Sequence, residues 1–201
     1  MKIQDIKEYL NIIPRGKALD LGCGNGNWSL FLANNGFNVI AIDNKDYVID
    51  NLFKKTSEEQ LSITTQKVDF RNFSFSKNEY SIILAMYSLC FLKRSDVFEM
   101  IKKMQNSVTK SGFIIMTLFT PRDAMFDKLK RTSQEVELNS FENKKGETFS
   151  FFLNQELKDA FDKWHIIECE EKEIKDPGHV GYENPHSHYI IQLVAQKIPT
   201  K

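Results

Sequence analysis

The chain has 201 residues, which is ample for one sizeable hydrophobic core and most simply forms a single domain over residues 1–201. Basic and acidic side chains balance at 27 each, so no overall charge would attract nucleic acid or an anionic membrane surface. The longest apolar run, residues 82–92, is far shorter than the roughly 20 residues of a membrane-spanning helix, and the start lacks an apolar signal segment. With three widely spaced cysteines, these features predict a cytoplasmic protein with no membrane partner.

Strands and helices are expected to alternate along the first part of the chain. A short helix is predicted within residues 1–16, ended by a Pro-Arg-Gly turn. Apolar runs then predict strands at residues 17–21, 37–43, 62–68, 80–85 and 113–119. Helical spacing of apolar residues predicts helices after the first, second and fourth of these strands, the last one capped by Ser95. Short connections between them predict a parallel sheet with right-handed crossovers.

The alternation stops at residues 120–148, which are polar and show few periodic apolar positions. A helix is then expected from a cap at Asn154, with apolar residues at helical spacing as far as Trp164. A strand follows from about residue 165, where several glutamates indicate a solvent-exposed edge. A last strand at residues 189–195 is expected to return beside the fifth strand.

A glycine-rich turn follows the first strand and opens the next helix. It contains Gly22, Gly24 and Gly26, and Asp43 ends the neighbouring strand roughly 20 residues on. Glycines let the backbone come close to a ligand, because a Cβ there would collide with it. A carboxylate at the tip of the neighbouring strand can accept two hydrogen bonds from a ribose diol. The pattern therefore predicts a nucleoside-binding crevice at the carboxyl edge of the sheet.

The spacing of the turn distinguishes it from a dinucleotide site. The dinucleotide fingerprint is Gly-x-Gly-x-x-Gly, whereas here the third glycine comes one residue early and Asn27 takes its place. Asp20, two residues before the first glycine, would lie awkwardly beside a pyrophosphate and suits a ligand with a cationic group. A nicotinamide-dependent oxidoreductase is therefore disfavoured. Cys23 lies inside the turn, where we expect a small spacer residue and not a nucleophile.

The pattern Asp-x-Gly-x-Gly-x-Gly followed by Asp43 resembles the class I S-adenosylmethionine-dependent methyltransferases. The resemblance implies a Rossmann-like α/β fold: a doubly wound seven-stranded sheet, mostly parallel with the last strand antiparallel, and helices on both faces. It also implies that Asp20 lies near the amino acid end of the cofactor, that Asp43 holds the ribose, and that Asp69 and Phe70 hold the adenine. The predicted cofactor-binding residues are Asp20, Gly22, Cys23, Gly24, Gly26, Asp43, Asn44, Asp69, Phe70 and Ala85.

A loop before the last strand holds three of the four histidines, His179, His186 and His188. Because histidine titrates near neutrality and loops often carry function, we expect these residues to bind the methyl acceptor or to act as acid or base. Tyr87, at the end of the fourth strand, completes the predicted catalytic set. We expect no metal. Two alternatives stay open, namely a metal site with His186 and His188 on one strand face and His179 nearby, and a histidine-rich surface hairpin.

Within that superfamily, the chain is most similar to the TehB-type tellurite-resistance methyltransferases. The similar features are the compact size, the run at residues 18–26, the Leu-Cys-Phe-Leu run at residues 89–92 and the Asp-Pro-Gly-His run at residues 176–179. Those enzymes handle small oxyanions with a histidine and arginines near that last loop. His179 matches the histidine by position, but no arginine follows Arg131, so tellurite or selenite is not implied as the substrate. In this family residues 120–148 lie beside the acceptor pocket, as a lid or as a bystander loop.

These observations predict a methyltransferase that uses S-adenosylmethionine to methylate a small-molecule acceptor, an oxyanion or a thiol. Enzymes that methylate amino groups of nucleobases usually carry Asn/Asp-Pro-Pro-aromatic after the fourth strand, and this chain has Ala-Met-Tyr-Ser at residues 85–88. We therefore expect no nucleic acid partner. The alternative is a non-catalytic S-adenosylmethionine-binding module that regulates a partner. A monomer or a homodimer is expected.

Overall fold

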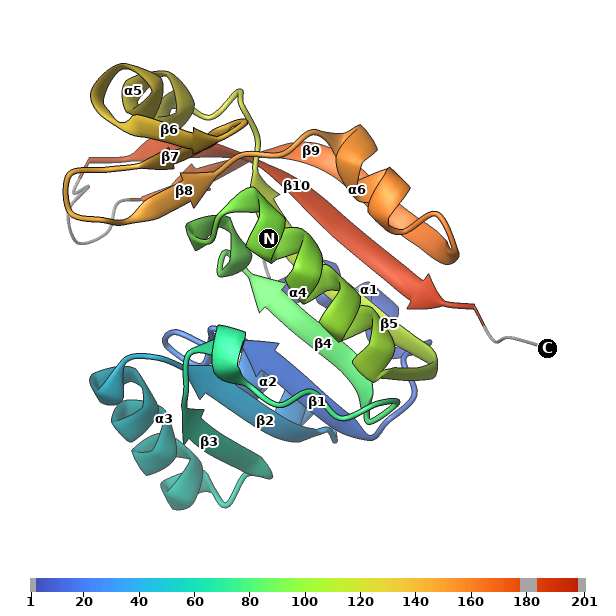
Figure 1. The fold of residues 1–201 in the computed structure, drawn as a ribbon. Helices are drawn as coiled ribbons and strands as arrows, with labels where there is room; N and C mark the ends of the chain where they lie inside the picture. Colours follow the sequence, from blue (N-terminus) through green and yellow to red (C-terminus); the bar gives the residue numbers. More distant parts are fainter. Residues whose placement is uncertain (1–2, 178–183, 199–201) are drawn as a thin grey trace.

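A seven-stranded sheet in the order β3-β2-β1-β4-β5-β10-β9 forms the centre of the protein (Figure 1). The computed structural model describes residues 3–177 and 184–198. The strands are β1 (Lys17–Leu21), β2 (Asn38–Asp43), β3 (Ile63–Lys67), β4 (Tyr80–Met86), β5 (Val108–Phe119), β9 (Trp164–Asp176) and β10 (His186–Lys197). β10 runs antiparallel to β5 and β9, while β1 to β5 pair in parallel. The predicted Rossmann-like sheet with an antiparallel last strand is confirmed.

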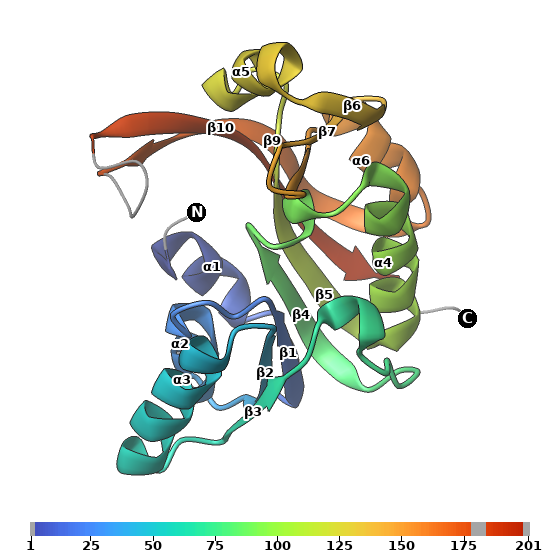
Figure 2. The same ribbon diagram turned by 60° about the vertical axis from the view of Figure 1, so that its left-hand side comes forward.

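Helices cover both faces of this sheet (Figure 2). On one face lie α1 (Ile3–Leu10), α2 (Asn27–Asn34) and α3 (Asp46–Glu59), and on the other lie α4 (Arg94–Ser107) and α6 (Asn154–Ala160). Leu32 of α2 and Leu52 of α3 belong to one buried apolar cluster, and Val97 and Met104 of α4 belong to the other. Within the described residues, no helix combines the length and the apolar character that crossing a bilayer would require.

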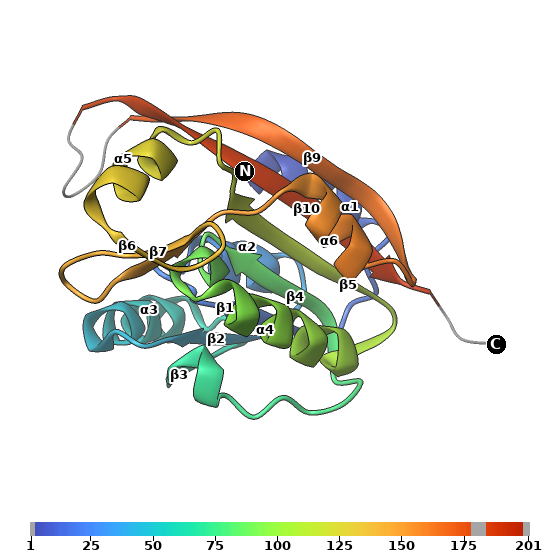
Figure 3. The same cartoon turned by 45° about the horizontal axis from the view of Figure 1, so that its top comes forward.

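The polar segment after β5 is folded, although its sequence shows few periodic apolar positions. It forms α5 (Ala124–Thr132) and a three-stranded antiparallel sheet of β6 (Gln134–Glu137), β7 (Ser140–Glu142) and β8 (Thr148–Ser150), which Figure 3 shows beside the main sheet. Phe126 anchors this unit, because its ring lies 5.4 Å from the ring of Phe141 and 5.1 Å from that of Phe151. Three aromatic residues far apart in sequence thus build a small core that periodicity does not reveal.

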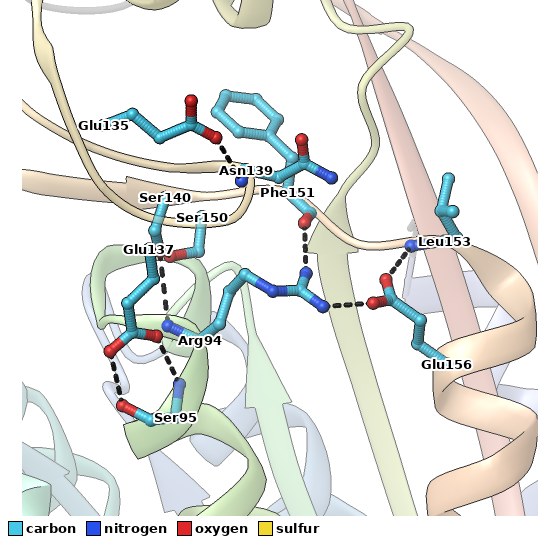
Figure 4. Close-up of polar contacts among 10 residues, drawn as sticks. All are labelled: Arg94, Ser95, Glu135, Glu137, Asn139, Ser140, Ser150, Phe151, Leu153 and Glu156. Atoms are coloured by element: carbon cyan, nitrogen blue, oxygen red, sulfur yellow. Dashed lines mark hydrogen bonds and ion pairs between the residues drawn. The ribbon is translucent and has the colours of Figure 1, made fainter.

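Arg94 ties the small sheet to α4 and α6 (Figure 4). Its side chain is only 10% exposed, donates a 2.7 Å hydrogen bond to the carbonyl of Phe151 and forms an ion pair with Glu156. Glu137 of β6 accepts hydrogen bonds from the backbone and the hydroxyl of Ser95, at 2.9 and 2.7 Å. The prediction that Ser95 caps α4 is therefore wrong: Lys93 precedes the helix, and a carboxylate from another element satisfies the exposed N–H.

The last helix is shorter than its apolar spacing predicted. α6 ends at Ala160, and Trp164 begins β9 instead of extending the helix. Leu153 takes the cap position expected for Asn154, and its N–H donates a 2.7 Å hydrogen bond to Glu156. The Trp164 ring still packs on Phe161, with 5.5 Å between ring centroids. The helical spacing of Phe161 and Trp164 therefore reflects a contact across the turn that follows α6 and not a continuation of the helix.

Candidate functional site

The glycine turn after β1 and the carboxylate at the end of β2 contact each other directly. The N–H of Gly24 donates a 3.1 Å hydrogen bond to Oδ2 of Asp43, and the N–H of Lys45 donates a 3.0 Å bond to Oδ1. An ionised carboxylate has about four acceptor positions, so two of them remain for a ligand. Asp43 is only partly exposed and is held in one orientation. The pair can therefore present carboxylate oxygens to a ribose diol.

The three glycines of the turn have different physical tasks. All have positive φ, at 73° for Gly22, 51° for Gly24 and 74° for Gly26. A Cβ on Gly22 would lie 2.6 Å from the Cβ of Ser88, and one on Gly26 would lie 2.4 Å from Cδ1 of Leu52. A Cβ on Gly24 would meet no protein atom within 4 Å. Packing thus requires glycine at 22 and 26, while Gly24 faces open space.

A cavity of about 640 Å³ lies beside this turn. Predicted residues that line it are Gly22, Gly24, Asp43, Asn44, Asp69, Phe70 and Tyr87. Arg71, which was not singled out from the sequence, lines it as well, and so do residues 146–149, at the end of the segment expected beside the acceptor pocket. The sequence signal that could have identified Arg71 is its position directly after the predicted adenine-binding pair. Residues 146–149 belong to the folded segment after β5, so part of residues 120–148 lies at the cavity.

Four residues predicted to bind the cofactor, Asp20, Cys23, Gly26 and Ala85, lie outside the cavity wall. Asp20 is 1% exposed and accepts a 2.6 Å hydrogen bond from the hydroxyl of Ser29. Burial raises the pKa of the Asp20 carboxyl to about 6. Burial also raises the pKa of the Cys23 thiol far above its ordinary value, which keeps it protonated and unreactive. Ala85 is fully buried within β4.

Asp69 reaches the cavity as half of an ion pair. Its Oδ1 accepts hydrogen bonds of 2.9 Å from both the backbone N–H and Nε of Arg71, and its Oδ2 contacts Nη2 at 2.5 Å. Hydrogen bonding to Arg71 lowers the pKa of the Asp69 carboxyl, so it is ionised at neutral pH. Phe70 stands between them in sequence, at the start of the short helix η1 (Phe70–Asn72). The carboxylate and the aromatic ring therefore lie together at the cavity, as an adenine site would require.

Tyr87 and Ser88 also line the cavity, at the carboxyl end of β4. Tyr87 has a φ of 55°, a strained value for an aromatic residue, and its N–H donates a 2.8 Å hydrogen bond to Oγ1 of Thr117. The hydroxyl of Ser88 is buried and has no hydrogen-bond partner among the described residues. Since buried hydroxyls are normally paired, that group is suited to a ligand.

Of the histidines expected at the acceptor, the two that the structure describes, His186 and His188, do not line this cavity. His186 and His188 lie on β10, with 3.0 Å between their Nε2 atoms. Nδ1 of His188 donates to Oδ2 of Asp123 at 2.8 Å, and this bond raises the pKa of His188 above its ordinary value. His179 lies outside the described residues. Their role toward an acceptor stays a prediction.

Comparison with known proteins identifies the family. The family described as "Tellurite resistance protein TehB" matches residues 2–176. A "Probable S-adenosyl-L-methionine-dependent methyltransferase TehB" of Haemophilus influenzae (strain 10810) is 29% identical over 168 residues, 83% of this chain and 52% of that protein. The crystal structure of TehB from Haemophilus influenzae superposes with a TM-score of 0.74 at 25% identity, covering 96% of this chain and 62% of that one.

A more distant relative has a name that describes an enzyme acting on RNA. An "rRNA adenine N-6-methyltransferase" of Bacteroides fragilis is 26% identical over 126 residues, 63% of this chain and 46% of that protein. The chain spans about half the length of the curated relatives it matches. The family match covers most of the chain and agrees with the resemblance of the glycine turn and its two acids. This protein belongs to the TehB family.

Proposed function

We propose that this protein is an S-adenosylmethionine-dependent methyltransferase that acts on a small-molecule acceptor. The observation that carries the proposal is the hydrogen bond from Gly24 to Asp43 beside an open cavity. Family membership supports it, as does the name of the Haemophilus relative. A cavity of about 640 Å³ is within the usual range for cofactor sites, roughly 300–1,000 Å³.

The residues present fit the cofactor along the length of the cavity. Asp43 would accept hydrogen bonds from the ribose hydroxyls, and Phe70 and Asp69 would flank the adenine. Open space above Gly24 leaves the backbone accessible to the ligand. Asp20, buried beneath the turn, would favour a cationic amino group at the other end through its charge. When bound, the cofactor supplies a methyl group activated as a sulfonium, so the protein's task is to position the reactants.

The acceptor would lie between the end of β4 and the small sheet. Tyr87 and Ser88 offer hydroxyls from one side, and Thr148 and Phe149 close the cavity from the other. Phe91 adds an apolar wall, which helps to exclude water. Holding the acceptor in line with the methyl group can supply roughly 7–11 kcal/mol in favourable cases.

An oxyanion or a thiol is the proposed acceptor class. Lys45 places a cationic group at the cavity, which suits an anionic acceptor, whereas the Arg71 guanidinium is paired with Asp69. His179, His186 and His188 are retained as candidates for acceptor binding. We propose no nucleic acid substrate, because residues 85–88 lack the Pro-Pro motif of nucleobase amino methylation. A monomer or homodimer in the cytoplasm completes the proposal.

A transfer assay with methyl-labelled S-adenosylmethionine tests this function. The acceptor panel contains tellurite, selenite, low-molecular-weight thiols and total bacterial RNA. The proposal predicts label in one of the small molecules and none in RNA. Label in RNA alone would show that the relation to the rRNA enzyme reaches to the substrate. Binding of S-adenosylhomocysteine without transfer to any acceptor would instead indicate a regulatory module.

A further inference from the structure

Two histidines and a carboxylate meet where β9 and β10 pair, away from the cavity described above. Asp176 and His186 are cross-strand partners in the β9–β10 register, and His188 follows two residues later on the same face of β10. One ligand atom from each of the three lies within 4.8 Å of the others. All three side chains are partly exposed, so an ion from solvent can reach them.

Hydrogen bonds fix which nitrogen of each ring faces the cluster. Nδ1 of His186 lies 2.9 Å from the carbonyl oxygen of Asn184, which can only accept, so this nitrogen carries the proton. Nδ1 of His188 lies 2.8 Å from Oδ2 of Asp123. That carboxylate is 3% exposed and also accepts from the N–H groups of Tyr189 and Met125, at 3.0 and 2.9 Å, so it acts as an acceptor toward His188 too.

When both rings are neutral, each Nε2 atom presents a lone pair, and the two atoms lie 3.0 Å apart. Two lone pairs at that distance repel unless a cation or a proton lies between them. Tetrahedral coordination at about 2.0–2.1 Å per nitrogen separates two imidazole ligands by about 3.3 Å, close to what is found here. Asp176 offers a carboxylate oxygen within 4.8 Å of the histidine ligand atoms as the third ligand.

The hydrogen-bond partners of the two rings match a metal site as well. Metal-binding histidines generally donate their other N–H to a carboxylate or a backbone carbonyl, which fixes the tautomer and the ring orientation. Here His188 donates to Asp123 and His186 donates to the carbonyl of Asn184. The ring of Phe119 packs 5.3 Å from that of His188 and holds it in place.

We propose that Asp176, His186 and His188 bind a divalent transition metal ion of the zinc class, with one coordination position left open. Two imidazoles and one carboxylate are donors that such ions accept. Asp123 precedes α5, so the ion would join the β9–β10 pair to the start of the segment that reaches the cofactor cavity (Figures 1 and 3). The proposal does not depend on methyl transfer.

Metal titration of the chelator-treated protein tests the site. Zn²⁺ is followed by calorimetry, and Co²⁺ by its visible absorption, which is strong only in tetrahedral surroundings. We expect one ion per chain. His186→Gln should weaken binding more than about 100-fold, and Asp123→Asn, which removes the carboxylate that orients the His188 ring, should weaken it about 10–100-fold.

His165 provides the matched control, because it is an exposed histidine at the far end of the same strand pair, opposite Gln196. His165→Gln should bind the ion as the unmodified protein does. His186→Gln is the decisive variant, since the His186 side chain is partly exposed and circular dichroism can verify the fold. The proposal is overturned if the unmodified protein binds no stoichiometric ion, or if His186→Gln binds as tightly as His165→Gln. The first result would mean that a proton is shared between the two rings.

Discussion

The N–H of Gly24 and Oδ2 of Asp43 are joined by a 3.1 Å hydrogen bond that links the tips of β1 and β2. The bond fixes the carboxylate next to the one glycine of the turn where a Cβ would meet no protein atom within 4 Å. Two acceptor positions of the carboxylate stay available at the cavity, because among the described residues the hydrogen bonds to it come from Gly24 and Lys45. A strand tip with an accessible backbone and a strand tip with an oriented charge together form the proposed nucleoside site.

Substitutions at two glycines should separate binding from stability. Gly24→Ala meets no protein atom within 4 Å, so it should cost only the left-handed backbone penalty of about 1–2 kcal/mol yet weaken S-adenosylhomocysteine binding at least about 10-fold. Gly26→Ala carries the same penalty plus a clash with Leu52. Its free energy of unfolding should therefore be about 1–3 kcal/mol lower than that of Gly24→Ala. Denaturant unfolding and calorimetry measure both. Equal stability of the two variants would contradict the assigned tasks.

Ser88→Ala should affect the ligand and not the fold. The Ser88 hydroxyl is buried without a hydrogen-bond partner among the described residues, so its removal should leave the free energy of unfolding unchanged or raise it by about 1 kcal/mol. Loss of one hydrogen bond to a ligand should lower kcat/KM about 5–10-fold. Ser107→Ala is the control, because Ser107 bonds the carbonyl of Lys103 and does not line the cavity. Unchanged kinetics of Ser88→Ala would place the ligand elsewhere.

Asp20 should make stability depend on pH below neutrality. Its folded pKa is raised from 3.8 to about 6 by burial, so the folded state binds more protons than the unfolded state between these values. This contribution to stability is fully present below pH about 4 and is lost as the pH rises through about 6, by about 2–3 kcal/mol. Asp20→Asn should flatten this part of the profile of unfolding free energy against pH. A profile that Asp20→Asn leaves unaltered would show that another group titrates there.

Arg94→Met should destabilise the protein strongly. It leaves the Phe151 carbonyl and the Glu156 carboxylate without their partner, and with Glu156 partly solvated we expect a loss of about 2–3 kcal/mol. Arg131→Met, at an exposed position, should change the free energy of unfolding by less than about 0.5 kcal/mol. Urea unfolding of the two variants provides the comparison. Similar midpoints would mean that Arg94 does not anchor the small sheet.

Local patterns made the sheet and the glycine turn predictable. An apolar strand, three glycines and a carboxylate at the next strand tip are all visible within residues 17–43. The small sheet was not predictable, because its strands have three or four residues and its core joins Phe126, Phe141 and Phe151 across the segment.

The hydrogen-bond and ion-pair partners of individual side chains could not be predicted from the sequence either. Arg71, two residues after Asp69, takes the carboxylate that the family resemblance assigns to adenine. Glu137 supplies the hydrogen bonds that Ser95 was expected to provide for its own helix. Such pairings are set by which elements fold together, and a single sequence does not show them.

Calorimetric titration of S-adenosylhomocysteine into the unmodified protein, Asp43→Ala and Asp50→Ala tests the central claim most directly. Asp50 is an exposed carboxylate on the neighbouring helix α3 and does not line the cavity, so Asp50→Ala should bind as the unmodified protein does. Loss of the charged acceptor for the ribose diol should raise the Kd of Asp43→Ala about 30–100-fold. Equal affinities in all three proteins would contradict the site, because the cofactor would then not rest on the tip of β2.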